Sequence, residues 1–133
     1  MSTLKDKSRF NRQAAELCLK NSLYSPSIHC SYYSCIQHMF FILFEKLKIT
    51  EKEFKKKRSR LRTGTHLSVI KLIGLDLIRK EKLDYESFQT LIRELKELRE
   101  KSDYKNFEIN QAEGWIAINH SDSIKNILTK NYR

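Results

Sequence analysis

Apolar residues recur along most of this sequence at intervals of three and four, the spacing of an amphipathic α-helix. The first such segment covers residues 9–23. One of its faces carries the residues that we expect to be buried, namely Phe10, Ala14, Leu17 and Cys18. No stretch alternates apolar and polar residues at a period of two for long enough to form a convincing β-strand. The pattern therefore predicts an all-α protein.

A second helix is predicted from residue 25 to about residue 48. It begins at Ser25-Pro26, a pair that favours an N-cap followed by a first-turn proline. Its expected buried face carries Ile28, Tyr32, Cys35, Ile36, Met39, Phe40, Leu43 and Leu47. Its lower half is apolar on nearly every side, because Phe41, Ile42 and Phe44 lie beside this face. A helix of this kind is buried centrally or pairs with another subunit. We expect a central helix that also contacts a partner.

Capping signals predict two helices in the middle of the chain. The pattern Thr50-Glu51-Lys52-Glu53 matches a capping box and predicts the start of a short helix. Thr65 follows the break at Thr63-Gly64 and is the expected cap of a helix over residues 66–80. The expected inward residues of that helix are Leu67, Ile70, Gly74 and Leu77, with Ile73 beside them.

Two more helices complete the chain. Asp84 is the expected cap of the first of these helices, which ends before a loop over residues 103–109. Asn110 and Glu113 form a capping pattern at the start of the last helix, which runs to about residue 130. The expected inward residues are Tyr85, Phe88, Leu91, Ile92, Leu95 and Leu98, and then Ala112, Trp115, Ile116, Asn119, Ser123 and Ile127. The pattern predicts an up-and-down bundle of four long helices plus a short one. We expect a single domain over residues 1–133, with its core at about 9–130.

Composition agrees with a helical domain and excludes several other classes. The 133 residues include three glycines and one proline, too few for a turn-rich β-sandwich, and 40% are hydrophobic, too many for a largely disordered chain. The longest nearly apolar run, residues 39–44, has six residues, whereas a membrane span needs about 20. The N-terminus lacks the apolar segment of a secretory signal. We expect a cytoplasmic protein with no membrane span.

The three cysteines, Cys18, Cys30 and Cys35, form no CxxC pair and match no zinc-binding spacing. We expect buried thiols in a reducing cytosol and no metal site. The sequence also has no glycine-rich phosphate loop and no HExxH or GxSxG motif. Metal-dependent chemistry, serine-hydrolase chemistry and a bound cofactor are therefore not expected.

Positive charge is concentrated in one segment. The chain has 26 Lys and Arg against 16 Asp and Glu, a net charge of +10, and residues 51–62 alone hold seven cations and two anions, a net +5. Such a cluster attracts nucleic-acid phosphates. The candidate nucleic-acid-binding residues are Lys55, Lys56, Lys57, Arg58, Arg60 and Arg62. The alternative is a solvated connecting segment that contacts no ligand.

Two of the four histidines occupy positions of chemical interest. His29 lies four residues before Tyr33 on the second predicted helix, so both are expected to face one pocket, although such a histidine can equally be a packing residue. His66 lies at a predicted helix N-terminus, where an anion is favoured and a protonated imidazole is disfavoured. A neutral His66 can act as a base, but the sequence shows no partner nucleophile.

The order of these features resembles the HEPN family. The resemblance rests on Ala14-Ala15-Glu16-Leu17, on Ser25-Pro26-Ser27-Ile28-His29-Cys30-Ser31-Tyr32-Tyr33-Ser34-Cys35, on Gly64-Thr65-His66 and on the segment from Leu95-Lys96-Glu97-Leu98-Arg99 to Asp103-Tyr104. It covers about residues 10–104 and continues into the last helix. It implies an up-and-down bundle that commonly forms a homodimer. It also implies bacterial toxin–antitoxin or defence systems, with RNA, a nucleotide or a nucleotidyltransferase as partner.

Catalytic members of that family are metal-independent endoribonucleases with an Arg-x4–6-His motif late in the bundle, paired across the dimer. The resemblance assigns His as acid and base for attack by the RNA 2′-hydroxyl, and Arg as the phosphate ligand. Here Arg99 is followed by Asp103 and Tyr104 instead of a histidine. Arg60 and His66 match the spacing but precede the third helix, so we interpret that match as chance.

The candidate catalytic set is therefore Arg99, His66, Asp103 and Tyr104. In the alternative, Arg99 pairs with Asp103 at i, i+4 and Tyr104 closes the helix end. The sequence favours a HEPN-like module that binds RNA or a nucleotide-handling partner without efficient cleavage. The alternatives are a metal-independent endoribonuclease and a pure protein-interaction module that uses residues 39–44.

Overall fold

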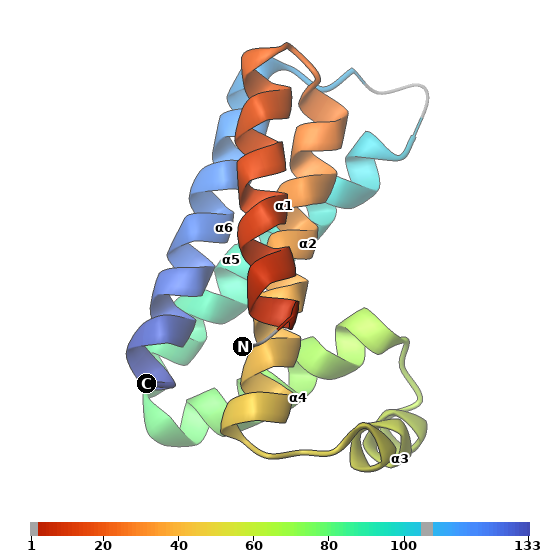
Figure 1. Cartoon of the computed structure of the whole chain (residues 1–133), viewed down its shortest axis with the longest axis vertical. Coiled ribbons are helices and arrows are strands. Elements are labelled where there is room, and N and C mark those ends of the chain that lie inside the picture. The colour runs from red at the N-terminus through yellow and green to blue at the C-terminus, as the bar shows by residue number, and fades with distance from the viewer. Residues whose placement is uncertain (1–2, 105–107) are drawn as a thin grey trace.

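The computed structural model describes residues 3–104 and 108–133, and within them every regular element is helical (Figure 1). The all-α prediction is confirmed. The described residues form six α-helices, one for each of the six segments that the sequence pattern marks, so the predicted bundle of four long helices plus a short one counts one helix too few. They are α1 (Thr3–Lys20), α2 (Tyr24–Phe41), α3 (Glu51–Leu61), α4 (Thr65–Lys80), α5 (Lys82–Ser102) and α6 (Gln111–Asn131), with a π-helical turn η1 (Ile42–Lys46) after α2.

The helix α2 is the centre of the molecule, as expected for the most apolar segment. It packs against α1 and α6 along its upper part and against α4 and α5 on its other side (Figure 1). Its residues Ile28, Tyr32, Cys35 and Met39 are completely buried. The short helix α3 lies at the lower end, away from the α1–α6 pair (Figure 1).

The turn η1 and one phenylalanine attach α3 to this bundle. The wider helical turn is closed by the Leu47 N–H, which donates to the Ile42 carbonyl at 2.9 Å. The ring of Phe54, the buried residue of α3, lies edge-on to the rings of Phe40 and Phe44, with centroids 5.4 and 6.2 Å apart. This aromatic contact fixes the inner side of α3.

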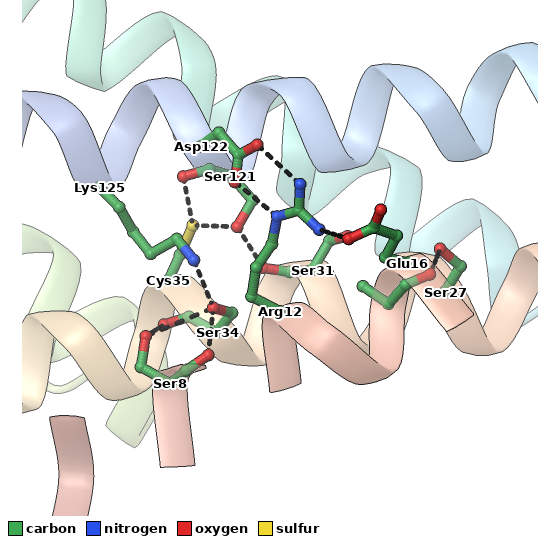
Figure 2. Close-up of polar contacts among 11 residues, drawn as sticks. Ser8, Arg12, Glu16, Ser27, Ser31, Ser34, Cys35, Ser121, Asp122 and Lys125 are labelled. Atoms are coloured by element: carbon green, nitrogen blue, oxygen red, sulfur yellow. Dashed lines mark hydrogen bonds and ion pairs between the residues drawn. The ribbon is translucent and has the colours of Figure 1, made fainter. Parts of the chain in front are cut away.

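Serine hydroxyls join α1, α2 and α6 (Figure 2). Ser8 and Ser34 exchange hydrogen bonds, because each hydroxyl donates to the carbonyl oxygen of the other residue, at 2.6 and 2.7 Å. Ser27 donates to the Ala15 carbonyl at 2.7 Å, and Ser121 donates to the Ser31 carbonyl at 2.9 Å. Small side chains let the helices approach closely. The hydroxyls of Ser8, Ser27, Ser34 and Ser121 find acceptors within the interface, whereas the buried Ser31 hydroxyl has no hydrogen-bond partner among the described residues.

Charged groups cover the edge of this interface. Arg12 of α1 donates to both carboxylate oxygens of Asp122 on α6, at 2.7 and 3.1 Å (Figure 2). The Lys125 ammonium donates to the Ser34 hydroxyl at 2.9 Å, and burial lowers the pKa of Lys125. Each contact ties α6 to one of the other two helices of this interface.

The predicted inward faces of the first and last helices are wrong. Phe10 and Leu17 are 57% and 64% exposed, and Trp115 and Ile116 are each 44% exposed. The buried residues are instead Ser8, Ala15 and Leu19 in α1, and Gly114, Ala117, Ile118, Ser121, Ile124 and Leu128 in α6. Several of these inward positions hold small residues, such as Ser8, Ala15 and Gly114, which a search for bulky apolar residues does not find, although Leu19, Ile118, Ile124 and Leu128 are buried as well.

Some predicted caps are confirmed and others are not. Thr50 accepts a hydrogen bond from the Glu53 N–H, and Asn110 and Glu113 form a capping box. Asp84 does not cap α5, which begins two residues earlier; its carboxylate instead accepts a hydrogen bond from Asn131 and pairs with Lys130.

The other caps shift by a residue or two. Neither Ser25 nor Thr65 is an N-cap, since Leu23 precedes α2 and Gly64 precedes α4. The predicted loop over residues 103–109 lies partly outside the described residues. Among the helices within residues 3–104 and 108–133, none combines the length and apolarity needed to cross a bilayer.

We expect Ser34→Ala to lower the free energy of unfolding by about 2 kcal/mol, because the Ser8 carbonyl and the Lys125 ammonium each lose a buried partner. Urea unfolding followed by circular dichroism measures this change. Ser123→Ala, at an exposed position on α6, is the matched control and should change the value by less than about 0.5 kcal/mol. Equal effects of the two substitutions would contradict the role given to the serine contacts.

Candidate functional site

The predicted basic segment is a helix with one face turned away from the bundle. Phe54 is buried and Leu61 is half-buried on its inner side. The opposite side presents exposed cations, which we call the basic face of α3: Lys52, Lys55, Lys56 and Arg60. Lys57 and Arg58 flank it and are half-buried, and Arg62 is exposed just beyond the helix end.

The charge of this segment is not neutralised locally. Within the part of the chain that the structure describes, none of its seven cations forms an ion pair with a carboxylate. Arg58 donates to the Thr65 hydroxyl at 3.0 Å, which joins the end of α3 to the first turn of α4. This bond connects a residue that flanks the basic face with the helix that begins at Thr65 and His66.

A second group of polar residues lies where α2, α4 and α5 meet. We call it the Tyr–His–Arg cluster: Tyr32, Tyr33, His66 and Arg99. The His66 ring lies 5.6 Å from the Tyr32 ring and 5.5 Å from the Tyr33 ring, between centroids. The Arg99 guanidinium lies over the Tyr32 ring at 4.7 Å from its centroid. His66 and Arg99 thus contact the same tyrosine.

The expected ion pair between Arg99 and Asp103 is not formed. Asp103 instead pairs with His29 at 2.8 Å, and the Ser102 hydroxyl lies 3.3 Å from the same imidazole nitrogen. Because His29 lies on α2, its contacts with the C-terminal end of α5 are tertiary contacts between residues that are far apart in the sequence. Arg99 is left stacked on Tyr32. Its Nε is buried and has no hydrogen-bond partner among the described residues.

The cluster favours a neutral imidazole beside a permanent cation. Burial lowers the pKa of His66, and the charges of Arg99 and Lys96 lower it further. Burial raises the pKa of Tyr32 to about 12, and Arg99 partly opposes this effect. The Tyr32 hydroxyl lies 3.4 Å from His66 Nδ1 and keeps its proton at neutral pH. The arrangement can hold an anion on Arg99 and accept a proton on His66.

The structure brings together only part of the predicted site. Arg99 and His66 share one cluster, whereas Asp103 faces His29, and Tyr104 follows the end of α5 with a side chain that is 62% exposed. Tyr33 packs on His66 while His29 bonds to α5, so these two do not share one pocket as expected.

Sequence reasoning missed Tyr32, which it assigned only to the buried face of the second helix. The residue is completely buried, in agreement with that assignment, but its ring also contacts both the His66 ring and the Arg99 guanidinium. The tyrosine pair at positions 32 and 33 was the only signal in the sequence that could have marked it.

The remaining candidate chemistry is limited. The described residues contain no group of three or more His, Cys, Asp or Glu side chains arranged to bind a metal ion. Cys35 is buried, and Cys18 and Cys30 are half-buried, where all three were expected to be buried; all are free thiols. The pKa of Cys30 is raised by burial and by the neighbouring Cys18.

We expect the pKa of His66, measured by NMR titration of its ring protons, to lie below its ordinary value of 6.5. Arg99→Gln should raise it, because one of the two cations that disfavour protonation is removed, and Lys96→Gln should raise it less. Arg93→Gln, an exposed position on the same helix, is the matched control and should leave it unchanged. A pKa that does not respond to Arg99→Gln would show that the two groups are not neighbours.

Comparison of this chain with protein-family models, with curated proteins and with solved structures finds no match. The similarity to the HEPN family, carried by short motifs in α1, α2, α4 and α5, therefore stays a prediction.

Proposed function

We propose that this chain is a HEPN-like helical module of the cytoplasm that binds RNA and does not cleave it efficiently. The observation that carries the proposal is the basic face of α3, whose cations have no carboxylate partner in the described residues and point away from the bundle. Cations left unpaired on a rigid helix release counterions when they meet phosphates, which favours binding to any RNA backbone. The homodimer and the nucleotidyltransferase partner expected from the family resemblance belong to the same proposal.

The position of α3 supports a continuous RNA path. The hydrogen bond from Arg58 to Thr65 links α3 to the first turn of α4, and the next residue is His66. An RNA strand bound to the basic face would extend from this linkage toward the Tyr–His–Arg cluster, in which Arg99 is half-buried. A guanidinium stacks on an aromatic ring through its flat face, whereas its N–H groups donate within its own plane. Stacking therefore leaves these N–H groups able to bind a phosphate oxygen.

The same cluster gives a physical reason for weak or absent cleavage. Attack by a 2′-hydroxyl needs a base for that hydroxyl and an acid for the leaving oxygen. His66 is the one histidine in the cluster, and its lowered pKa keeps it in the basic form. Asp103 occupies the place where the family motif has a histidine, and its carboxylate is already paired with His29.

RNA binding is tested by fluorescence anisotropy with a labelled single-stranded RNA at increasing NaCl. We expect the triple variant Lys55→Ala, Lys56→Ala, Arg60→Ala to weaken binding at least tenfold at about 0.1 M salt and to reduce the salt slope by about 2. The matched control Lys7→Ala, Arg79→Ala, Lys82→Ala removes three exposed cations elsewhere and should have a much smaller effect. Equal losses in both variants would mean that net charge alone attracts RNA and would overturn the assignment.

A metal-independent endoribonuclease is the second candidate, favoured by the contact of both His66 and Arg99 with Tyr32. Incubation of the protein with RNA in EDTA tests it. Under our proposal nearly all of the RNA stays intact. Cleavage that leaves 2′,3′-cyclic phosphate ends, and that is lost in His66→Ala and Arg99→Ala but kept in Arg93→Ala, would establish the enzyme instead.

A further inference from the structure

An apolar groove of about 560 Å³ runs between α4 and α5, on the side of both helices that α2 does not cover. Its floor and walls are formed by apolar side chains together with the backbone of one glycine. These residues are Leu61, Leu67, Ile70, Gly74, Leu75, Ile78, Tyr85, Phe88 and Ile92. The groove is separate from the basic face of α3, because Leu61 reaches it from the opposite side of that helix.

The groove exists because α4 is apolar on two sides. Val69, Ile73 and Leu77 are completely buried against the core. A second stripe faces the groove, and in it Leu75 and Ile78 remain 56% and 40% exposed. A surface helix needs one apolar stripe to pack on its own domain. The second stripe is an exposed patch of apolar side chains, and such patches mark interaction sites.

The shape of the groove fits a helix. Gly74 has no side chain, and a Cβ placed there would lie 3.3 Å from Tyr85 Cε1, so Tyr85 can lie close to the α4 backbone. From Leu67 to Ile78 the lining of α4 extends for about 16 Å, which is three turns of an α-helix. Such a groove accepts a partner helix whose apolar residues recur at i, i+3, i+4 and i+7.

The charged residues around the groove favour a partner of opposite charge. Its charged lining residues are Lys71, Arg93 and Lys96, and no carboxylate lines it. A second copy of this chain would bring a further net charge of +10 to a cationic rim. A helix with acidic residues beside its apolar stripe would instead place its carboxylates on the three cations and its apolar side chains in the groove.

From these observations we infer that the α4–α5 groove binds an acidic amphipathic helix of a partner protein. Apolar anchors of that helix fill the space over Gly74 and Tyr85, and its carboxylates pair with Lys71, Arg93 and Lys96. The inference does not depend on RNA binding, because the basic face of α3 stays open when the groove is filled.

The test uses two labelled helical peptides of about 15 residues, identical in their leucine stripe, with Glu in one and Lys in the other at the flanking positions. We expect the full chain to bind the Glu peptide at least tenfold more tightly than the Lys peptide at low salt. Leu75→Glu should weaken that binding at least tenfold, because it places a carboxylate within the apolar contact. Leu83→Glu is the matched control, since Leu83 is 71% exposed and lies outside the groove.

Charge reversal provides a second measurement that does not rely on loss of binding. The variant Lys71→Glu, Arg93→Glu should prefer the Lys peptide over the Glu peptide. Equal binding of both peptides by the wild-type chain, or equal effects of Leu75→Glu and Leu83→Glu, would overturn the inference. It would also be overturned if Leu75→Glu converted a dimer to a monomer in sedimentation, or weakened RNA binding as much as peptide binding, because the groove would then belong to a second copy or to RNA.

Discussion

The exchange of hydrogen bonds between Ser8 and Ser34 is the contact on which the arrangement of the other helices depends. It brings the backbones of α1 and α2 together, and the bonds from Ser27 and Ser121 extend the same close packing along α2 and onto α6. One side of α2 is thereby fixed against two helices. The other side must then face α4 and α5, and Tyr32 is fixed where His66 and Arg99 can both reach its ring. The candidate site thus lies on a different side of α2 from the Ser8–Ser34 contact.

A second constraint sets the direction of the basic face. Because the π-helical turn η1 follows α2 directly, Phe40 and Phe44 stack on each other and leave room for Phe54 edge-on to both rings. This contact is the one buried anchor of α3. With Phe54 turned inward, helical geometry places Lys52, Lys55, Lys56 and Arg60 outward. The sequence showed only that positive charge is concentrated in residues 51–62. The structure places this charge on one side of α3.

Local signals predicted the elements well and their packing less well. The all-α class and the caps at Thr50 and Asn110 followed from short-range chemistry. The inward faces of α1 and α6 did not, because Ser8, Ala15 and Gly114 pack by being small, while the bulky Phe10 and Trp115 stay exposed. The site residues divided in the same way. Asp103 was expected either in the catalytic set or in a pair with Arg99, four residues before it. In the structure its partner is instead His29 of α2, 74 residues away along the chain.

Lys96 connects the two surfaces that α4 and α5 share. Its side chain lines the apolar groove, and its charge helps Arg99 to keep His66 neutral. A carboxylate that paired with Lys96 from within the groove would offset part of that charge, so protonation of His66 would become easier. The cation rim of the groove and the imidazole of the Tyr–His–Arg cluster are therefore electrostatically linked, although one surface is mainly apolar and the other polar. The link arises from helix geometry, because Lys96 and Arg99 are three residues apart and so lie on neighbouring positions of α5.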